Sequence, residues 1–187
     1  MSFSATFRVG IRTLTPTSGV GLLRLLLLVV WMPTMGIAQT LATGGRIATF
    51  TVHDQHDQEH TLNTEVSLLL FSRDMDGGDV IKAGLKGFTQ QQLDEKHVVF
   101  LSDISAMPGF VATVFAKPKM RKSAYTMWLD EDGDITAKLP GEEDHASLIF
   151  LHDLQITSVE ITDQPERVHA ALAALSTTGP SRGDLSD

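Results

Sequence analysis

The segment from Val66 to Ser72 reads VSLLLFS, and it constrains the fold more than any other part of the chain. A strand that exposes one face to water alternates apolar and polar residues, whereas this run is apolar almost throughout. Such a run is typical of a central strand buried on both faces. The segment HVVFLSDIS, at residues 97 to 105, predicts a second buried strand. The chain is therefore expected to form a sheet that is covered on both sides.

A helical pattern separates these two strands. Beginning at Asp79, apolar residues recur at Ile81, Leu85 and Phe88, which places one apolar stripe on a helix that reaches Glu95. A strand, a helix and a second strand in this order indicate a parallel crossover. The centre of the sheet is therefore predicted to be parallel.

The other predicted elements surround this central unit. In chain order they are a strand with a returning edge over 47 to 62, a helix from Pro108 that ends at Pro118, a hairpin around Asp132 and Gly133, a strand pair over 148 to 161, and a last helix after the capping-box spacing of Asp163 to Glu166. Crossovers in the first half and hairpins in the second predict an α/β fold with a mixed central sheet flanked by helices.

The N-terminal residues 1 to 38 have the pattern of a signal peptide. The segment contains three arginines and no acidic residue, and an apolar run follows the last arginine. The small residues Gly36 and Ala38 then stand just before Gln39, as at a signal-peptide cleavage site. The alternative, a retained membrane anchor, needs about 20 apolar residues, whereas this run is shorter and contains Pro33. We therefore expect cleavage after Ala38 and a periplasmic or secreted protein with no membrane attachment.

The mature chain is expected to contain a flexible lead at 39 to 46, one domain at 47 to 175 and a disordered tail at 176 to 187. The formal charge of the chain is −8, and loss of the three arginines with the signal peptide makes it −11. Because an acidic protein repels the phosphate backbone, nucleic-acid binding is not expected.

The chain contains no cysteine. Disulfides, thiol redox catalysis and thiolate metal sites all require that sulfur, so thiol–disulfide oxidoreductase and thiol peroxidase activities are excluded for this chain. Its stability is expected to come from packing alone. The sequence also has no glycine fingerprint for a dinucleotide, no phosphate-binding Walker loop and no Gly-x-Ser-x-Gly motif, so no cofactor is expected.

The order of elements over residues 47 to 175 resembles the thioredoxin and peroxiredoxin superfamily. In that superfamily a strand such as SLLLFSRD leads into a loop with the redox cysteines, at the start of a helix; here that loop spans Asp74 to Asp79. A cis-proline faces the cysteines in the superfamily, and Ser123 and Ala124 stand in its place here. The resemblance implies a thioredoxin-like fold in an exported bacterial protein that lacks the redox residues.

The acidic residues of this loop, Asp74, Asp76 and Asp79, are the candidate functional residues. A carboxylate at the start of a helix caps the backbone amides, and Asp76 or Asp79 is the expected cap. Alternatively, Asp74 and Asp76 form a pair that acts as general acid and base or binds a hard cation. The sequence leaves both interpretations open.

Three histidines, His53, His56 and His60, are weak candidates for a metal site. Imidazoles suit zinc or copper, but the predicted strand and turn would separate the three side chains, so an exposed polar turn is the expected interpretation. The acidic run Asp130 to Asp134 is unlike an EF-hand, because Ile135 stands where that loop needs glycine. We therefore expect no metal ion.

A basic run of Lys117, Lys119, Arg121 and Lys122 follows the predicted helix. These cations either complement the negative end of the helix dipole or bind an anionic ligand or partner.

For the whole chain, the expected function is non-catalytic binding of an unidentified protein or small molecule. The rival interpretation is a non-thiol enzyme that uses the Asp74 and Asp76 loop.

Overall fold

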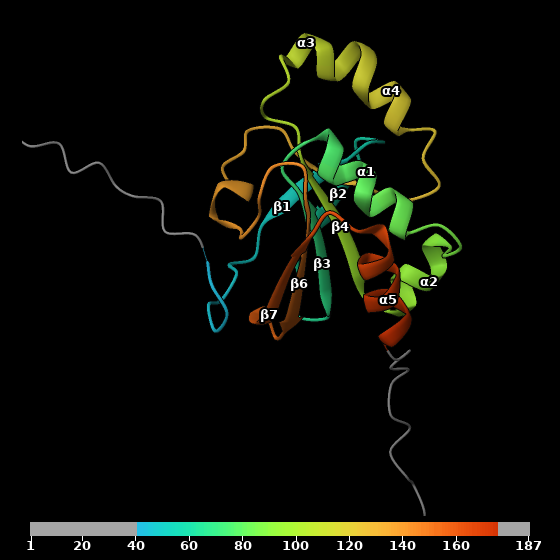
Figure 1. Ribbon diagram of the computed structural model, residues 1–187. Coiled ribbons are helices and arrows are strands. Elements are labelled where there is room, and N and C mark those ends of the chain that lie inside the picture. Colours follow the sequence, from blue (N-terminus) through green and yellow to red (C-terminus); the bar gives the residue numbers. More distant parts are fainter. Residues whose placement is uncertain (1–40, 176–187) are drawn as a thin grey trace, which may run out of the picture. The chain divides into compact units, whose positions relative to one another are not determined.

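The structure is a computed structural model that describes residues 41 to 175 (Figure 1). The predicted signal peptide at 1 to 38, the first two residues of the predicted lead and the predicted tail at 176 to 187 lie outside the described residues. No helix within the described residues combines the length and the apolar character needed to cross a membrane.

Seven strands of the described residues form one mixed sheet. They are β1 Thr51–Asp54, β2 Glu59–Thr61, β3 Leu68–Ser72, β4 Val98–Asp103, β5 Trp128–Asp130, β6 Ala146–His152 and β7 Gln155–Thr162. Their order across the sheet is β2-β1-β5-β4-β3-β6-β7. β4 pairs in parallel with both β3 and β5, and the outer pairs are antiparallel. The predicted mixed sheet with a parallel centre is confirmed.

Strand β3 is buried at all five of its positions, as its composition predicted. Leu68 and Leu70 contribute to one hydrophobic cluster, while Leu69 and Phe71 contribute to a second cluster on the opposite face of the sheet. Helices α1 Met75–Gly84, α2 Gln90–Glu95 and α5 Pro165–Ala174 lie along the first face (Figure 1). Loop residues such as Leu139 cover the second face.

The predicted helix over 79 to 95 is wrong in its start and in its continuity, because the structure has two helices there. α1 begins one turn earlier, at Met75, and ends before Gly87, whose φ of +92° lies in the left-handed region that glycine tolerates. Thr89 and Gln92 then form a capping box that begins α2. Gly77 and Gly78 lie in the first turn of α1, and their presence is the reason why the sequence predicted a loop there.

The helix predicted from Pro108 is present but extends past Pro118. It consists of α3 Gly109–Val111, a π-helical turn at Ala112–Ala116 and α4 Lys117–Met120, which together we call the 109–120 helix. Pro118 lies in the first turn of α4. In the continuous 109–120 helix, Pro118 can donate no backbone hydrogen bond to the preceding turn, and the π-helical turn directly before α4 accommodates it, so the chain remains helical to Met120.

The hairpin predicted around Asp132 and Gly133 is wrong. β5 pairs with β1 and β4, and it is followed by a 3-10 turn at Thr136–Lys138 instead of a returning strand. The cause is Asp130, a buried side chain that accepts hydrogen bonds from the amides of the following residues and folds the loop back on the strand end.

The C-terminal elements agree with their predictions apart from one cap. β6 and β7 form the predicted strand pair, and Val168 and Leu172 are buried on α5. Asp163 is not the cap of this helix. Gln164 occupies the cap position, and its side chain makes no capping hydrogen bond.

The described part of the predicted flexible lead is hydrogen-bonded to the domain. The amide of Leu41 donates to the carbonyl of Lys138, and the amide of Gly44 donates to the carbonyl of Ile156.

Candidate functional site

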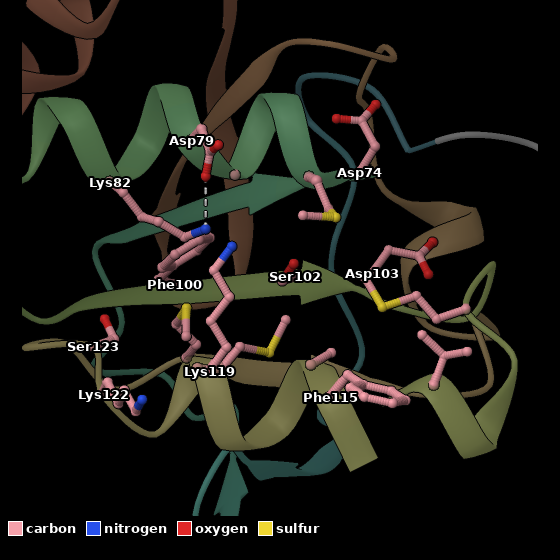
Figure 2. Close-up of a pocket in the computed structure, with 17 residues that line it drawn as sticks. Asp74, Asp79, Lys82, Phe100, Ser102, Asp103, Phe115, Lys119, Lys122 and Ser123 are labelled. Atoms are coloured by element: carbon pink, nitrogen blue, oxygen red, sulfur yellow. Dashed lines mark hydrogen bonds and ion pairs between the residues drawn. The ribbon is translucent and has the colours of Figure 1, made fainter. Parts of the chain in front are cut away.

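A cavity of about 520 Å³ lies between the start of α1, the end of β4 and the 109–120 helix (Figure 2). Most of its wall is apolar, and six large side chains contribute to it: Met75, Phe100, Met107, Phe115, Met120 and Met127. Phe100 and Met127 are only 3% and 2% exposed, whereas Met75 and Phe115 are 54% and 62% exposed. The cavity therefore has a buried apolar floor and an open apolar rim.

Methionine supplies four of these six side chains. Its unbranched thioether adapts to irregular shapes, and methionine-rich surfaces accommodate varied apolar partners. Sequence reasoning did not find these residues, because Met75, Met107, Met120 and Met127 come from separate segments with no common spacing. Only the fold brings them to one wall.

Asp74 lies at the edge of the cavity, but both of its carboxylate oxygens are occupied by backbone amides. Oδ1 accepts from the amide of Gly77 at 2.8 Å, and Oδ2 accepts from the amide of Asp144 at 2.7 Å. Asp74 is therefore the cap of α1, in place of the predicted Asp76 or Asp79. The same bonds tie the start of the helix to the loop before β6.

The other two acids of the loop are not placed for joint chemistry with Asp74. Asp79 lines the cavity and forms an ion pair with Lys82 at 2.8 Å. Asp76 is exposed and is not part of the cavity wall. The structure thus brings Asp74 and Asp79 to one cavity and leaves Asp76 outside it. Ser123, at the position expected to match the cis-proline of the superfamily, also lines the cavity.

The basic run at the end of the 109–120 helix divides between two faces. Lys117 pairs with Asp57 at 3.0 Å and with Glu131 at 2.7 Å, and Arg121 pairs with Asp57 at 2.6 Å. The hydrogen bonds that Lys117 donates to Glu131 and Asp57 raise the pKa of Lys117, and the bond from Lys117 in turn lowers the pKa of Asp57. Lys119 and Lys122 instead line the cavity.

The three candidate histidines are held apart by the β1–β2 hairpin. His53 lies on β1, His56 in the turn and His60 on β2, where its ring stacks on Trp128 with centroids 5.2 Å apart. His60 Nε2 lies 2.9 Å from Oδ2 of the buried Asp54. Burial acts to raise the pKa of Asp54, but the hydrogen bond from His60 and those from two backbone amides leave it below its usual value. Within residues 41 to 175, no three histidine or acidic side chains are grouped as a metal site.

Comparisons with known proteins identify the fold. No protein-family model and no curated protein match this chain. Among solved structures, a protein described as a disulfide isomerase from Bacteroides thetaiotaomicron is 17% identical, with a TM-score of 0.51, over 71% of this chain and 86% of its own. A protein described as the thiol:disulfide interchange protein DsbE from Chlorobium tepidum is 16% identical, with a TM-score of 0.50, over 73% of this chain and all of its own. The fold is thioredoxin-like. At sequence identities this low, the similarity to these two proteins concerns the fold alone.

This chain has a thioredoxin-like fold and contains no cysteine. The loop that the superfamily resemblance assigned to the redox residues is instead the capped start of α1, and it borders an apolar cavity. The arrangement can enclose an apolar group between α1 and the 109–120 helix. It offers no thiol, and the carboxylate of Asp74, at its edge, accepts hydrogen bonds from two backbone amides.

Proposed function

We propose that this chain is an exported, non-catalytic binding protein of the bacterial periplasm or exterior, and that its ligand is an apolar molecule held in the cavity. The observation that carries the proposal is the cavity itself. Its volume of about 520 Å³ falls within the usual range for small-molecule sites, and its wall is mainly apolar with a few polar groups at the edge.

The rival interpretation, a non-thiol enzyme built on Asp74 and Asp76, has less support. Both oxygens of Asp74 accept amide hydrogen bonds within the protein, which fix this carboxylate as the cap of α1 and leave it fewer lone pairs for a substrate proton. A carboxylate pair also needs two converging side chains, and Asp76 is not part of the cavity wall. Binding therefore accounts better for this geometry than catalysis.

Nile red, a neutral apolar dye whose fluorescence increases in apolar surroundings, tests the cavity directly. The mature chain should bind it with a one-to-one stoichiometry. Met107→Asp places a charge in the cavity wall and should weaken binding at least about tenfold, because burying a charge against an apolar ligand is costly. The readout is a fluorescence titration, with circular dichroism to verify folding.

Val114→Asp is the matched control for this test. Val114 is 48% exposed on the 109–120 helix and is not part of the cavity wall, so this variant should bind Nile red as the parent does. Equal losses in both variants would place the dye on the exposed face of the helix and would contradict the proposal. Absence of any binding to the parent would contradict it as well.

Export is tested by expressing the full chain in a bacterial host and fractionating the cells. The proposal rests on the basic, apolar and small-residue succession at the N-terminus. Mass spectrometry of the periplasmic or extracellular protein should find Gln39 as the new first residue. A chain that retains Met1 and stays in the cytoplasm would refute export.

A further inference from the structure

We propose that the ligand of the cavity is an amphiphile with an anionic head group, and that Lys82, Lys119 and Lys122 bind this group. The inference rests on the proposed binding function and adds the chemical class of the ligand. Its basis is an imbalance of charge between the two ends of the cavity, where lysines lie at one end and Asp74 and Asp103 at the other (Figure 2).

At the acidic end, the carboxylates have their hydrogen-bond partners within the protein. Asp74 accepts from two backbone amides. Asp103 accepts from the amide and hydroxyl of Ser105 at 2.9 and 2.7 Å through Oδ1, and from the hydroxyl of Thr136 at 2.8 Å through Oδ2. These hydrogen bonds hold both carboxylates in place and leave their negative charge, so the charges of the cavity wall are segregated, with acids at this end and lysines at the other.

At the basic end, the charges are not balanced. Lys82 is paired with Asp79, but within residues 41 to 175 neither Lys119 nor Lys122 is in an ion pair. At this end of the cavity wall, three lysines therefore outnumber one aspartate. Figure 2 shows Lys82 on α1 and Lys119 on α4 pointing toward one another above Phe100. An anion placed between them would offset their mutual repulsion and accept hydrogen bonds from both.

The division of the basic run supports a role in binding over a dipole effect alone. Lys117 and Arg121, four residues apart, share the face that pairs with Asp57. Lys119 and Lys122, three residues apart, share the face that lines the cavity. A simple complement to the helix dipole would not require two of the cations to border an apolar cavity in a chain of net charge −8.

The apolar floor and the basic edge together define the ligand. The methionine and phenylalanine side chains suit an alkyl or aromatic body, and the ammonium groups suit a carboxylate, sulfonate or phosphate at its end. The test compares three molecules with the same ten-carbon chain: decanoate, decanol and decyltrimethylammonium. At pH 7 the first is anionic, the second neutral and the third cationic.

Displacement of bound Nile red from the mature chain measures all three molecules. Decanoate should displace the dye at a concentration about tenfold lower than decanol, and the cationic chain should be the weakest, because two charge-assisted hydrogen bonds favour the anion. In the double variant Lys119→Gln with Lys122→Gln, the preference for decanoate should fall to about threefold or less. This preference is the ratio of the two displacing concentrations within one variant, so a change in Nile red affinity cancels from it.

The control is the double variant Lys86→Gln with Lys138→Gln, which makes the same change of net charge at exposed positions outside the cavity wall. It should retain the preference for decanoate. Equal displacement by decanoate and decanol in the parent, or an unchanged preference in the cavity variant, would overturn the anionic head group while leaving apolar binding intact. Absence of Nile red binding would instead overturn the proposed function itself.

Discussion

Replacement of Asp130 by alanine should lower the free energy of unfolding by about 3 to 5 kcal/mol, because it leaves several buried donors without partners. Asp130 is 3% exposed, and its carboxylate accepts from the amides of Gly133 at 3.0 Å, Ile135 at 3.1 Å and Thr136 at 2.8 Å. The Thr136 hydroxyl lies 2.9 Å from the same carboxylate and shares its single proton with Oδ2 of Asp103, at 2.8 Å. A single side chain thus holds the whole turn after β5.

Urea unfolding followed by far-ultraviolet circular dichroism measures this loss. Asp132→Ala is the matched control, since Asp132 is an exposed acid in the same loop, and its replacement should change the free energy of unfolding by no more than about 0.5 kcal/mol. Asp130→Asn, which keeps one acceptor oxygen, should fall between the two. A loss below about 1 kcal/mol for Asp130→Ala would show that water or neighbouring groups replace the carboxylate.

Gly77→Ala should destabilise the protein by about 1 to 3 kcal/mol, because α1 approaches the loop before β6 too closely for a side chain. A Cβ at residue 77 would lie 2.3 Å from the carbonyl oxygen of His145 and 2.9 Å from its carbonyl carbon. These are backbone atoms, which cannot turn aside as a flexible side chain does. Either the helix or the loop must shift.

Gly109→Ala is the control for this prediction, because Gly109 also lies in the first turn of a helix but a Cβ there meets nothing within 4 Å. This variant should be as stable as the parent or more stable by up to about 1 kcal/mol, since alanine restricts the unfolded chain. The comparison uses urea unfolding under identical conditions. A Gly77→Ala variant as stable as Gly109→Ala would refute the close approach.

The two predictions concern places where reasoning from the sequence failed. Asp132 and Gly133 have the composition of a hairpin turn, but a local pattern contains no information about the strands that flank β5, and β1 and β4 occupy both of its edges, so no returning strand can pair with it. Gly77 and Gly78 look like loop residues, although they lie in the first turn of α1. In both places a tertiary contact overrides the local preference.

The same limit applies to the candidate site. The loop from Asp74 to Asp79 was correctly placed at the end of a buried strand, because a change from a continuous apolar run to a helical period is visible in the sequence. The sequence did not show which of the three aspartates caps the helix. Asp74 is distinguished from Asp76 and Asp79 by its bond from the amide of Gly77 and by a second bond from the amide of Asp144, seventy residues further along the chain.

The sequence by itself determined the buried central strand, the parallel centre of the sheet and the absence of thiol chemistry. These follow from composition and period, which depend on residues close together in the chain. The tertiary structure alone decided the cavity and the division of the basic run, with Lys117 turned to Asp57 and Lys119 to the apolar wall. The reason is physical: a site of this kind consists of side chains from α1, β4 and the 109–120 helix, and their distances are set by how the helices pack on the sheet.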